Sequence, residues 1–253
     1  MISLKFPAFH WMVALFLCSW CSQPLAAADP APTGKPALRI LNIGDSISKG
    51  GHLTALQKHL VEAGFTDYEF VGPFKRSGKP KPTDRQAYGG MTIKQMLHGR
   101  VRDGKEEPGA MKSVPEYRPN VILFLGGINN LVHVKPGNLP AVEAEWNELI
   151  DYLTGELPEA TIFASLVIAV HPERKWAAKQ PVIDQFNAWV KQAVAERSAK
   201  GQKIVLVDLN RAISPDDYRP DGLHLVATGD AKLGETWFEA LREHGVVPAM
   251  QAK

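Results

Sequence analysis

The strongest constraint on the fold is a set of apolar runs that lack a regular alternation of apolar and polar residues. The clearest is Val-Ile-Leu-Phe-Leu at residues 121–125, which stops at a pair of glycines. Similar runs cover residues 37–43, 161–170 and 204–209. Strands without alternation are buried on both faces, as they are in a parallel sheet covered by helices. The chain is therefore expected to form an α/β fold.

Segments with a helical spacing of apolar residues lie between these runs. In residues 53–63, Leu53, Leu56 and Leu60 recur at helical intervals, and Gly64 follows as a typical helix-end glycine. Further helices are predicted over residues 92–99, 140–153, 182–198 and 228–244, with a brief strand over residues 68–71 and a basic surface loop over residues 75–85. Five strands that alternate with helices predict a three-layer α/β sandwich.

The first 28 residues have the pattern of a secretory signal peptide. Lys5 is their only formally charged side chain, residues 11–20 are almost wholly apolar, and residues 26–28 are three alanines that offer a cleavage site. The apolar run is shorter than the roughly 20 residues that span a bilayer, and an uncleaved anchor is the alternative. After cleavage we expect a secreted or periplasmic protein without stable membrane insertion. It would comprise a flexible lead-in at residues 29–36, one domain at residues 37–247 and a tail at residues 248–253.

Both cysteines, Cys18 and Cys21, belong to the predicted signal peptide. The mature protein is therefore expected to have no disulfide, no thiol nucleophile and no thiolate metal site, and we expect neither a metal nor a cofactor. A formal net charge of +2 gives no reason to expect nucleic acid as a partner. The sequence does not specify an oligomeric state.

Four polar clusters follow predicted strands or lie on loops that can reach the strand ends, where ligands bind in α/β sheets. The first is Gly44-Asp45-Ser46, directly after the first strand. It would present Ser46 at the mouth of a site, with its N–H near a helix start that favours negative charge. The alternative is that Asp45 and Ser46 only cap a helix. The spacing of residues 44–51 does not fit a phosphate-binding loop.

The second and third clusters could supply hydrogen-bond donors. Gly89 and Gly90 precede a predicted helix, and paired glycines can bring a bare N–H close to a substrate oxygen. Gly126-Gly127 precedes Asn129, whose amide could donate to the same oxygen. In each case the alternative is an ordinary turn.

The fourth cluster is Asp221-Gly-Leu-His224, between the last strand and the last helix. A carboxylate three residues before a histidine can orient the ring and stabilise its charged form. The alternative is that His224 merely begins a helix. His171 is the one rival histidine, because it also follows a predicted strand.

In order and wording, these clusters resemble the SGNH (GDSL-type) hydrolase family, and secreted carbohydrate esterases within it. The resemblance spans residues 40–241. Its matches are Ser46 in a GDS motif, Gly90 in the second block, Asn129 in a G-x-N-D-like motif, Asp221 and His224 in a D-x-x-H motif, and Asn187 after Phe186 in the penultimate helix. One departure is Asn130, which stands where the family usually has aspartate.

The resemblance implies a flavodoxin-like three-layer α/β/α sandwich with a five-stranded parallel sheet. It also implies an acyl-enzyme mechanism in which Ser46 attacks an ester carbonyl and His224, supported by Asp221, moves the proton. The oxyanion would be held by the N–H groups of Ser46 and Gly90 and by the Asn129 side chain. Asn130 would support a loop without touching the reacting carbonyl.

On this basis we expect a secreted esterase that acts on small acyl esters, acetyl esters first, and on carbohydrates in particular. The carbohydrate preference rests on predicted secretion, on the likeness of residues 88–93 to secreted carbohydrate esterases, and on the absence of a long apolar lid. A lysophospholipase or short-chain lipase of the same fold is the alternative enzyme. An inactive glycan-binding module on this scaffold is the alternative of another class.

Overall fold

The computed structural model describes residues 38–135 and 137–247. The predicted signal peptide, the lead-in and the tail lie outside the described residues. At the centre is a parallel sheet with the order β2-β1-β6-β7-β8, which is the flavodoxin-like order. Its strands are β1 Leu38–Gly44, β2 Tyr68–Val71, β6 Val121–Leu125, β7 Thr161–Ser165 and β8 Ile204–Val207. The prediction of a five-stranded parallel sheet is therefore confirmed for the main body of the sheet.

A sixth, two-residue strand was not predicted. This strand, β3, spans Gln86–Ala87 and pairs in parallel with the carboxyl end of β1, where Gly44 faces Ala87. Its pairing extends the sheet beyond the end of β2. As a result, the segment that follows β3 starts beside the segment that follows β1, which carries Ser46.

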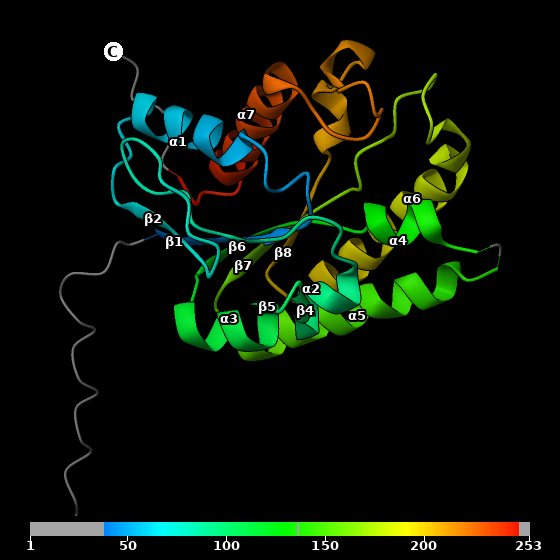
Figure 1. Ribbon diagram of the computed structural model, residues 1–253. Coiled ribbons are helices and arrows are strands. Elements are labelled where there is room, and N and C mark those ends of the chain that lie inside the picture. Colours follow the sequence, from blue (N-terminus) through cyan, green and yellow to red (C-terminus); the bar gives the residue numbers. More distant parts are fainter. Residues whose placement is uncertain (1–37, 136, 248–253) are drawn as a thin grey trace, which may run out of the picture. The chain divides into compact units, whose positions relative to one another are not determined.

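Helices cover both faces of the sheet (Figure 1). On one face lie α1 His52–Glu62 and α7 Ala227–Glu243, which pack on each other. Gly234 of α7 makes their close approach possible, because a Cβ at this position would overlap the Ala55 side chain. On the other face lie α2 Ile93–His98, α3 Ala110–Tyr117 and α5 Leu139–Glu156, with α6 Gln180–Ala199 packed against α5 and β8.

The remaining elements lie on the connections. They are α4 Ile128–His133, the antiparallel hairpin of β4 Arg100–Arg102 and β5 Lys105–Glu107, and the 3-10 helices Ala177–Lys179, Leu209–Ala212 and Pro215–Asp217. Within the described part of the chain, no helix is long and apolar enough to cross a membrane.

Two apolar runs end their strands earlier than predicted. The run at residues 161–170 leaves the sheet after Ser165, although its last residues are still largely buried. There the backbone of Val167 pairs with the Asn187 side chain, which accepts from its N–H and donates to its carbonyl at 2.9 Å each. The run at residues 204–209 likewise ends its strand at Val207. Burial alone therefore made these segments look like strand.

Candidate active site

Ser46 lies in a tight turn immediately after β1. Gly44 ends the strand, and a Cβ there would overlap the Leu125 carbonyl oxygen and the Ser48 side chain. Asp45 braces the turn, because its Oδ1 accepts from the Ile47 N–H at 2.9 Å. Burial raises the pKa of Asp45 to about 7, against the lowering effects of this hydrogen bond and of the charge on His224. Ser46 itself is only half-buried, so its hydroxyl is accessible.

The reading of Asp45 and Ser46 as a helix cap is wrong. Helix α1 begins at His52, and its N-terminal flanking residue is Gly51. The segment 75–85 is not a simple surface loop either, because Arg85 at its end is fully buried. The Arg85 guanidinium donates to the carbonyls of Ser48 and Gly50 at 2.9 and 3.1 Å, so it anchors the turn that carries Ser46.

The structure brings Ser46, His224 and Asp221 into one hydrogen-bonded series. His224 Nε2 lies 2.8 Å from Ser46 Oγ, and His224 Nδ1 lies 2.7 Å from Asp221 Oδ2. Asp221 Oδ1 also accepts from the backbone N–H groups of Leu223 and His224, at 2.9 Å each. Partial burial raises the pKa of Asp221, but these hydrogen bonds and the charge of His224 outweigh it and hold the pKa below its usual value. An ionised carboxylate therefore orients the imidazole.

His171 takes no part in this series. Its Nδ1 accepts from the Glu173 N–H at 3.0 Å, and its ring packs edge-on against Tyr218 at a centroid distance of 5.8 Å. The geometry favours His224 as the partner of Ser46.

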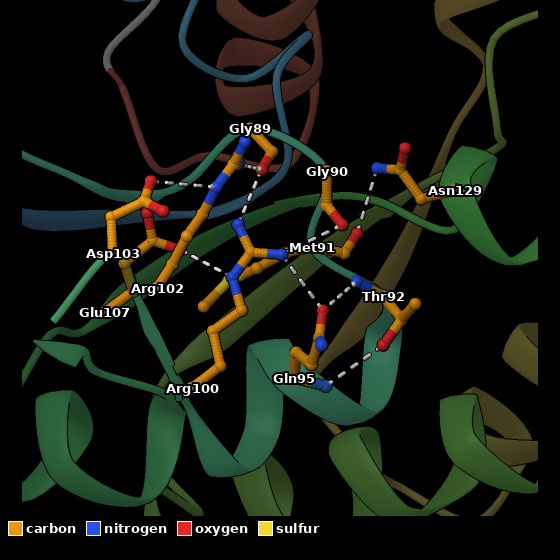
Figure 2. Close-up of polar contacts among 10 residues, drawn as sticks. All are labelled: Gly89, Gly90, Met91, Thr92, Gln95, Arg100, Arg102, Asp103, Glu107 and Asn129. Atoms are coloured by element: carbon orange, nitrogen blue, oxygen red, sulfur yellow. Dashed lines mark hydrogen bonds and ion pairs between the residues drawn. The ribbon is translucent and has the colours of Figure 1, made fainter. Parts of the chain in front are cut away.

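The two predicted oxyanion segments contact each other, and the first of them lies beside Ser46. Gly90 has φ +77°, a left-handed conformation that favours glycine, and a Cβ placed on Gly89 would lie 3.9 Å from Ser46 Cβ. Asn129 belongs to the short helix α4 and not to a turn. Its Nδ2 donates to the Met91 carbonyl at 3.0 Å, which leaves the second N–H of the amide for another acceptor (Figure 2).

Asn130 supports a loop, as expected. It does so through both the oxygen and the nitrogen of its side-chain amide. Its Oδ1 accepts from the Ile93 N–H at 2.9 Å, which fixes the start of α2. Its Nδ2 donates to Glu145 Oε2 at 2.7 Å. A carboxylate at position 130 could not make the contact with Glu145, because both side chains would then be hydrogen-bond acceptors.

Two residues near the site escaped the sequence analysis. Arg100 and Arg102, on the β4–β5 hairpin, reach the backbone of Gly89 and Gly90 (Figure 2). The signal that could have revealed the hairpin is Asp103-Gly104, a dipeptide typical of tight hairpin turns. Both residues have positive φ, 52° and 71°.

A pocket of about 290 Å³ opens next to Ser46 and His224. Three charged residues, Lys49, Arg219 and Asp230, contribute to its lining. Over residues 38–135 and 137–247, no group of three or more His, Cys, Asp or Glu side chains could hold a metal ion.

Comparison with known proteins agrees with this fold. Residues 43–232 match the model of the GDSL-like lipase/acylhydrolase family. A multidomain esterase of Ruminococcus flavefaciens is 25% identical over 86% of this chain, and the match spans 30% of that protein's length. A family 3 carbohydrate esterase of Clostridium thermocellum is 25% identical, with a TM-score of 0.65 over 83% of this chain and 99% of that structure. A family 3 carbohydrate esterase of Talaromyces cellulolyticus, 18% identical, shares the fold with a TM-score of 0.65 over 81% of this chain and 96% of that structure.

A flavodoxin-like sheet with a serine, a histidine and an aspartate joined at its carboxyl edge is typical of hydrolases with a three-layer α/β/α fold. Within that class, the chain belongs to the GDSL-like lipase/acylhydrolase family. It is an SGNH-type carboxylic ester hydrolase that resembles carbohydrate esterases.

Proposed function

We propose that this protein is a secreted serine esterase that removes small acyl groups, acetyl groups first, from carbohydrates. The observation that carries the proposal is the pair of short contacts that join Ser46, His224 and Asp221, 2.8 and 2.7 Å long. This arrangement lets a neutral imidazole take the serine proton while a carboxylate stabilises the resulting charge.

In the proposed reaction, Ser46 Oγ forms a bond to the ester carbonyl carbon while its proton passes to His224 Nε2. The negative charge that develops on the carbonyl oxygen is held by the N–H groups of Ser46 and Gly90 and by the Asn129 amide. The bond to the alcohol oxygen then breaks, and His224 returns the proton to the leaving alcohol. A water molecule repeats these steps on the acyl-enzyme and releases the acid.

The lining of the pocket supports a polar substrate. Lys49, Arg219 and Asp230 face the space beside Ser46, and such groups suit the hydroxyls of a sugar better than an acyl chain. The volume of about 290 Å³ suits a small acyl group with part of its carrier. The likeness to the carbohydrate esterase of Clostridium thermocellum points in the same direction.

An ester panel tests this proposal. Purified protein is assayed on p-nitrophenyl esters from acetyl to long-chain acyl, and then on acetylated xylan and pectin, with Ser46→Ala as the blank. We expect kcat/KM to be highest for acetyl and to fall steadily with chain length. A maximum at long acyl chains would instead identify a lipase or lysophospholipase. Failure to react with a serine-directed phosphonate, together with glycan binding, would identify an inactive binding module.

We also propose that the protein is exported, on the basis of residues 1–28. N-terminal sequencing of material from the periplasm or medium should find a start near Asp29. Retention of Met1 in the membrane fraction would contradict cleavage.

A further inference from the structure

The β4–β5 hairpin places two guanidinium groups on one peptide carbonyl of the oxyanion segment. Arg100 Nη2 and Arg102 Nη1 donate to the Gly89 carbonyl oxygen at 2.6 and 2.8 Å (Figure 2). Arg100 Nη1 also donates to the Gly90 carbonyl at 3.1 Å. Hydrogen bonds from charged donors are about twice as strong as neutral ones, so this segment is held firmly.

Arg100 is itself fixed in place. Its Nε donates to Glu107 Oε2 at 2.6 Å, and its Nη1 lies 3.2 Å from Gln95 Oε1. The side chains of Arg100 and Glu107 are only 15% and 19% exposed, so solvent competes little for this pair. Because Glu107 lies on the opposite strand of the hairpin, the guanidinium is oriented before any substrate arrives.

The hydrogen bonds from the two arginines to the Gly89 carbonyl determine where the Gly90 N–H points. In a trans peptide unit the C=O of one residue and the N–H of the next point in opposite directions. Neither Gly89 nor Gly90 has a Cβ, so this peptide could otherwise rotate with little steric resistance. When the arginines hold the Gly89 carbonyl on the hairpin side, the Gly90 N–H must point away from the hairpin. The two cations also polarise the amide, which strengthens its N–H as a donor.

We propose that Arg100 and Arg102 are positioning residues that lock the Gly89–Gly90 peptide and thereby aim and strengthen the Gly90 N–H toward the oxyanion. The inference rests on the proposed function, in which this N–H is one of the oxyanion donors. The hairpin is then a brace for the transition state, and substrate binding in the ground state does not depend on it.

Three variants test the brace: Arg100→Met, Arg102→Met and the double variant. Arg100→Met should lower kcat by about 10–100-fold, less than the loss of a whole oxyanion donor, with KM unchanged within about twofold. Arg102→Met should lower kcat by about 2–5-fold, because Arg100 keeps its hold on the same carbonyl. The double variant should lower kcat by more than the product of the two single-variant factors, since neither arginine then holds the Gly89 carbonyl. Arg100→Lys should recover only part of kcat, because lysine lacks the planar fork.

Arg211→Met is a matched control. The Arg211 side chain is 51% exposed and paired with an acidic residue, as the Arg102 side chain is 54% exposed and paired with Asp103. The partner of Arg211 is Glu239 of α7, which does not belong to the oxyanion segment. We expect wild-type kcat from this control. Melting temperatures are measured for every variant, and if Arg100→Met fails to fold, Arg102→Met serves as the test.

A boronic acid that forms a tetrahedral adduct with Ser46 supplies a readout that a merely structural role would not move. Its Ki should rise by the same factor by which kcat/KM falls across the variants, and the pH profile of kcat should not change. Wild-type kcat in folded Arg102→Met and in the folded double variant, or a rise in KM alone, would overturn the brace. Activity in Ser46→Ala would instead overturn the proposed function, so the two failures can be told apart.

Discussion

The acid–base side of the site and the oxyanion side differ in how their parts are distributed along the chain. Asp221 and His224 share one turn, and Asp221 binds both the ring and the backbone of His224. The oxyanion side gathers the loop after β3, the helix α4 and the β4–β5 hairpin. The first side is ordered by local hydrogen bonds, whereas the second depends on contacts between segments. Loss of His224 on the first side should abolish function, whereas loss of one group on the second side should only weaken it.

Removal of the nucleophile or the base should give the largest effect. Ser46→Ala and His224→Ala should each lower kcat by about 10⁴–10⁶-fold, because each removes an obligatory step. Both side chains lie at the pocket and outside the core, so thermal melts should match the wild type. His171→Ala is the matched control and should keep its activity. Loss of activity in His171→Ala with a functional His224→Ala would show that the base is misassigned.

Loss of one oxyanion donor should be less severe. Asn129→Ala should lower kcat by about 10²–10³-fold with little change in KM, because the amide acts on charge that develops only in the transition state. Asn129→Asp, which keeps the shape of the side chain but replaces the donor with an acceptor, should be impaired as strongly. Steady-state kinetics on a soluble acetyl ester measure both. A change confined to KM would mean that Asn129 binds the substrate and not the oxyanion.

His52, behind the turn that carries Ser46, should make stability depend on pH. Burial, reinforced by the charges of Arg85 and Arg76, lowers the pKa of His52 to about 3. The folded protein therefore keeps this ring neutral, while the unfolded chain takes up a proton below about pH 6.5. The free energy of unfolding therefore keeps its full value above about pH 6.5. It decreases as the pH falls, by about 2 kcal/mol at pH 5. Urea unfolding at pH 7.5 and pH 5 should show a smaller loss in His52→Leu than in the wild type or in the surface control His98→Gln.

The smallest effect concerns Asn130. Glu145 Oε2 lies 2.7 Å from the Asn130 amide nitrogen. Asn130→Asp would set two carboxylates together and lose one hydrogen bond, at a cost of about 1 kcal/mol, with kcat within a few fold. Adding Glu145→Gln should restore the melting temperature. A stabilised Asn130→Asp single variant would contradict this account.

The sheet was predictable because its central strands are so apolar. Residues 121–125 form β6 with the predicted bounds. The hairpin at residues 100–107 was not predictable in the same way, because it is largely exposed and charged and has no apolar face. Its structure comes from a turn and from ion pairs that become visible only in three dimensions.

The residues of the site likewise divide into those that the sequence predicted and those that it did not. Asp221 and His224 were found because the residues that interact are also neighbours in sequence. The partners of Gly89 and Asn130 were missed, since Arg100 and Glu145 act across separate segments and nothing in the local sequence marks them. Spacing along the chain predicts local pairs well, and long-range supports poorly.

The distance between Ser46 and His224 along the chain has a consequence for biosynthesis. The ribosome makes Ser46, the proposed nucleophile, before His224, the proposed base, which follows 178 positions later. Each residue is followed by one helix of the α1–α7 pair, so the two helices can pack only after residues 227–243 have been made. A nascent chain therefore carries a serine without its base. We therefore expect the capacity to cleave esters to arise only when α7 docks on α1, and shorter nascent chains to be inactive.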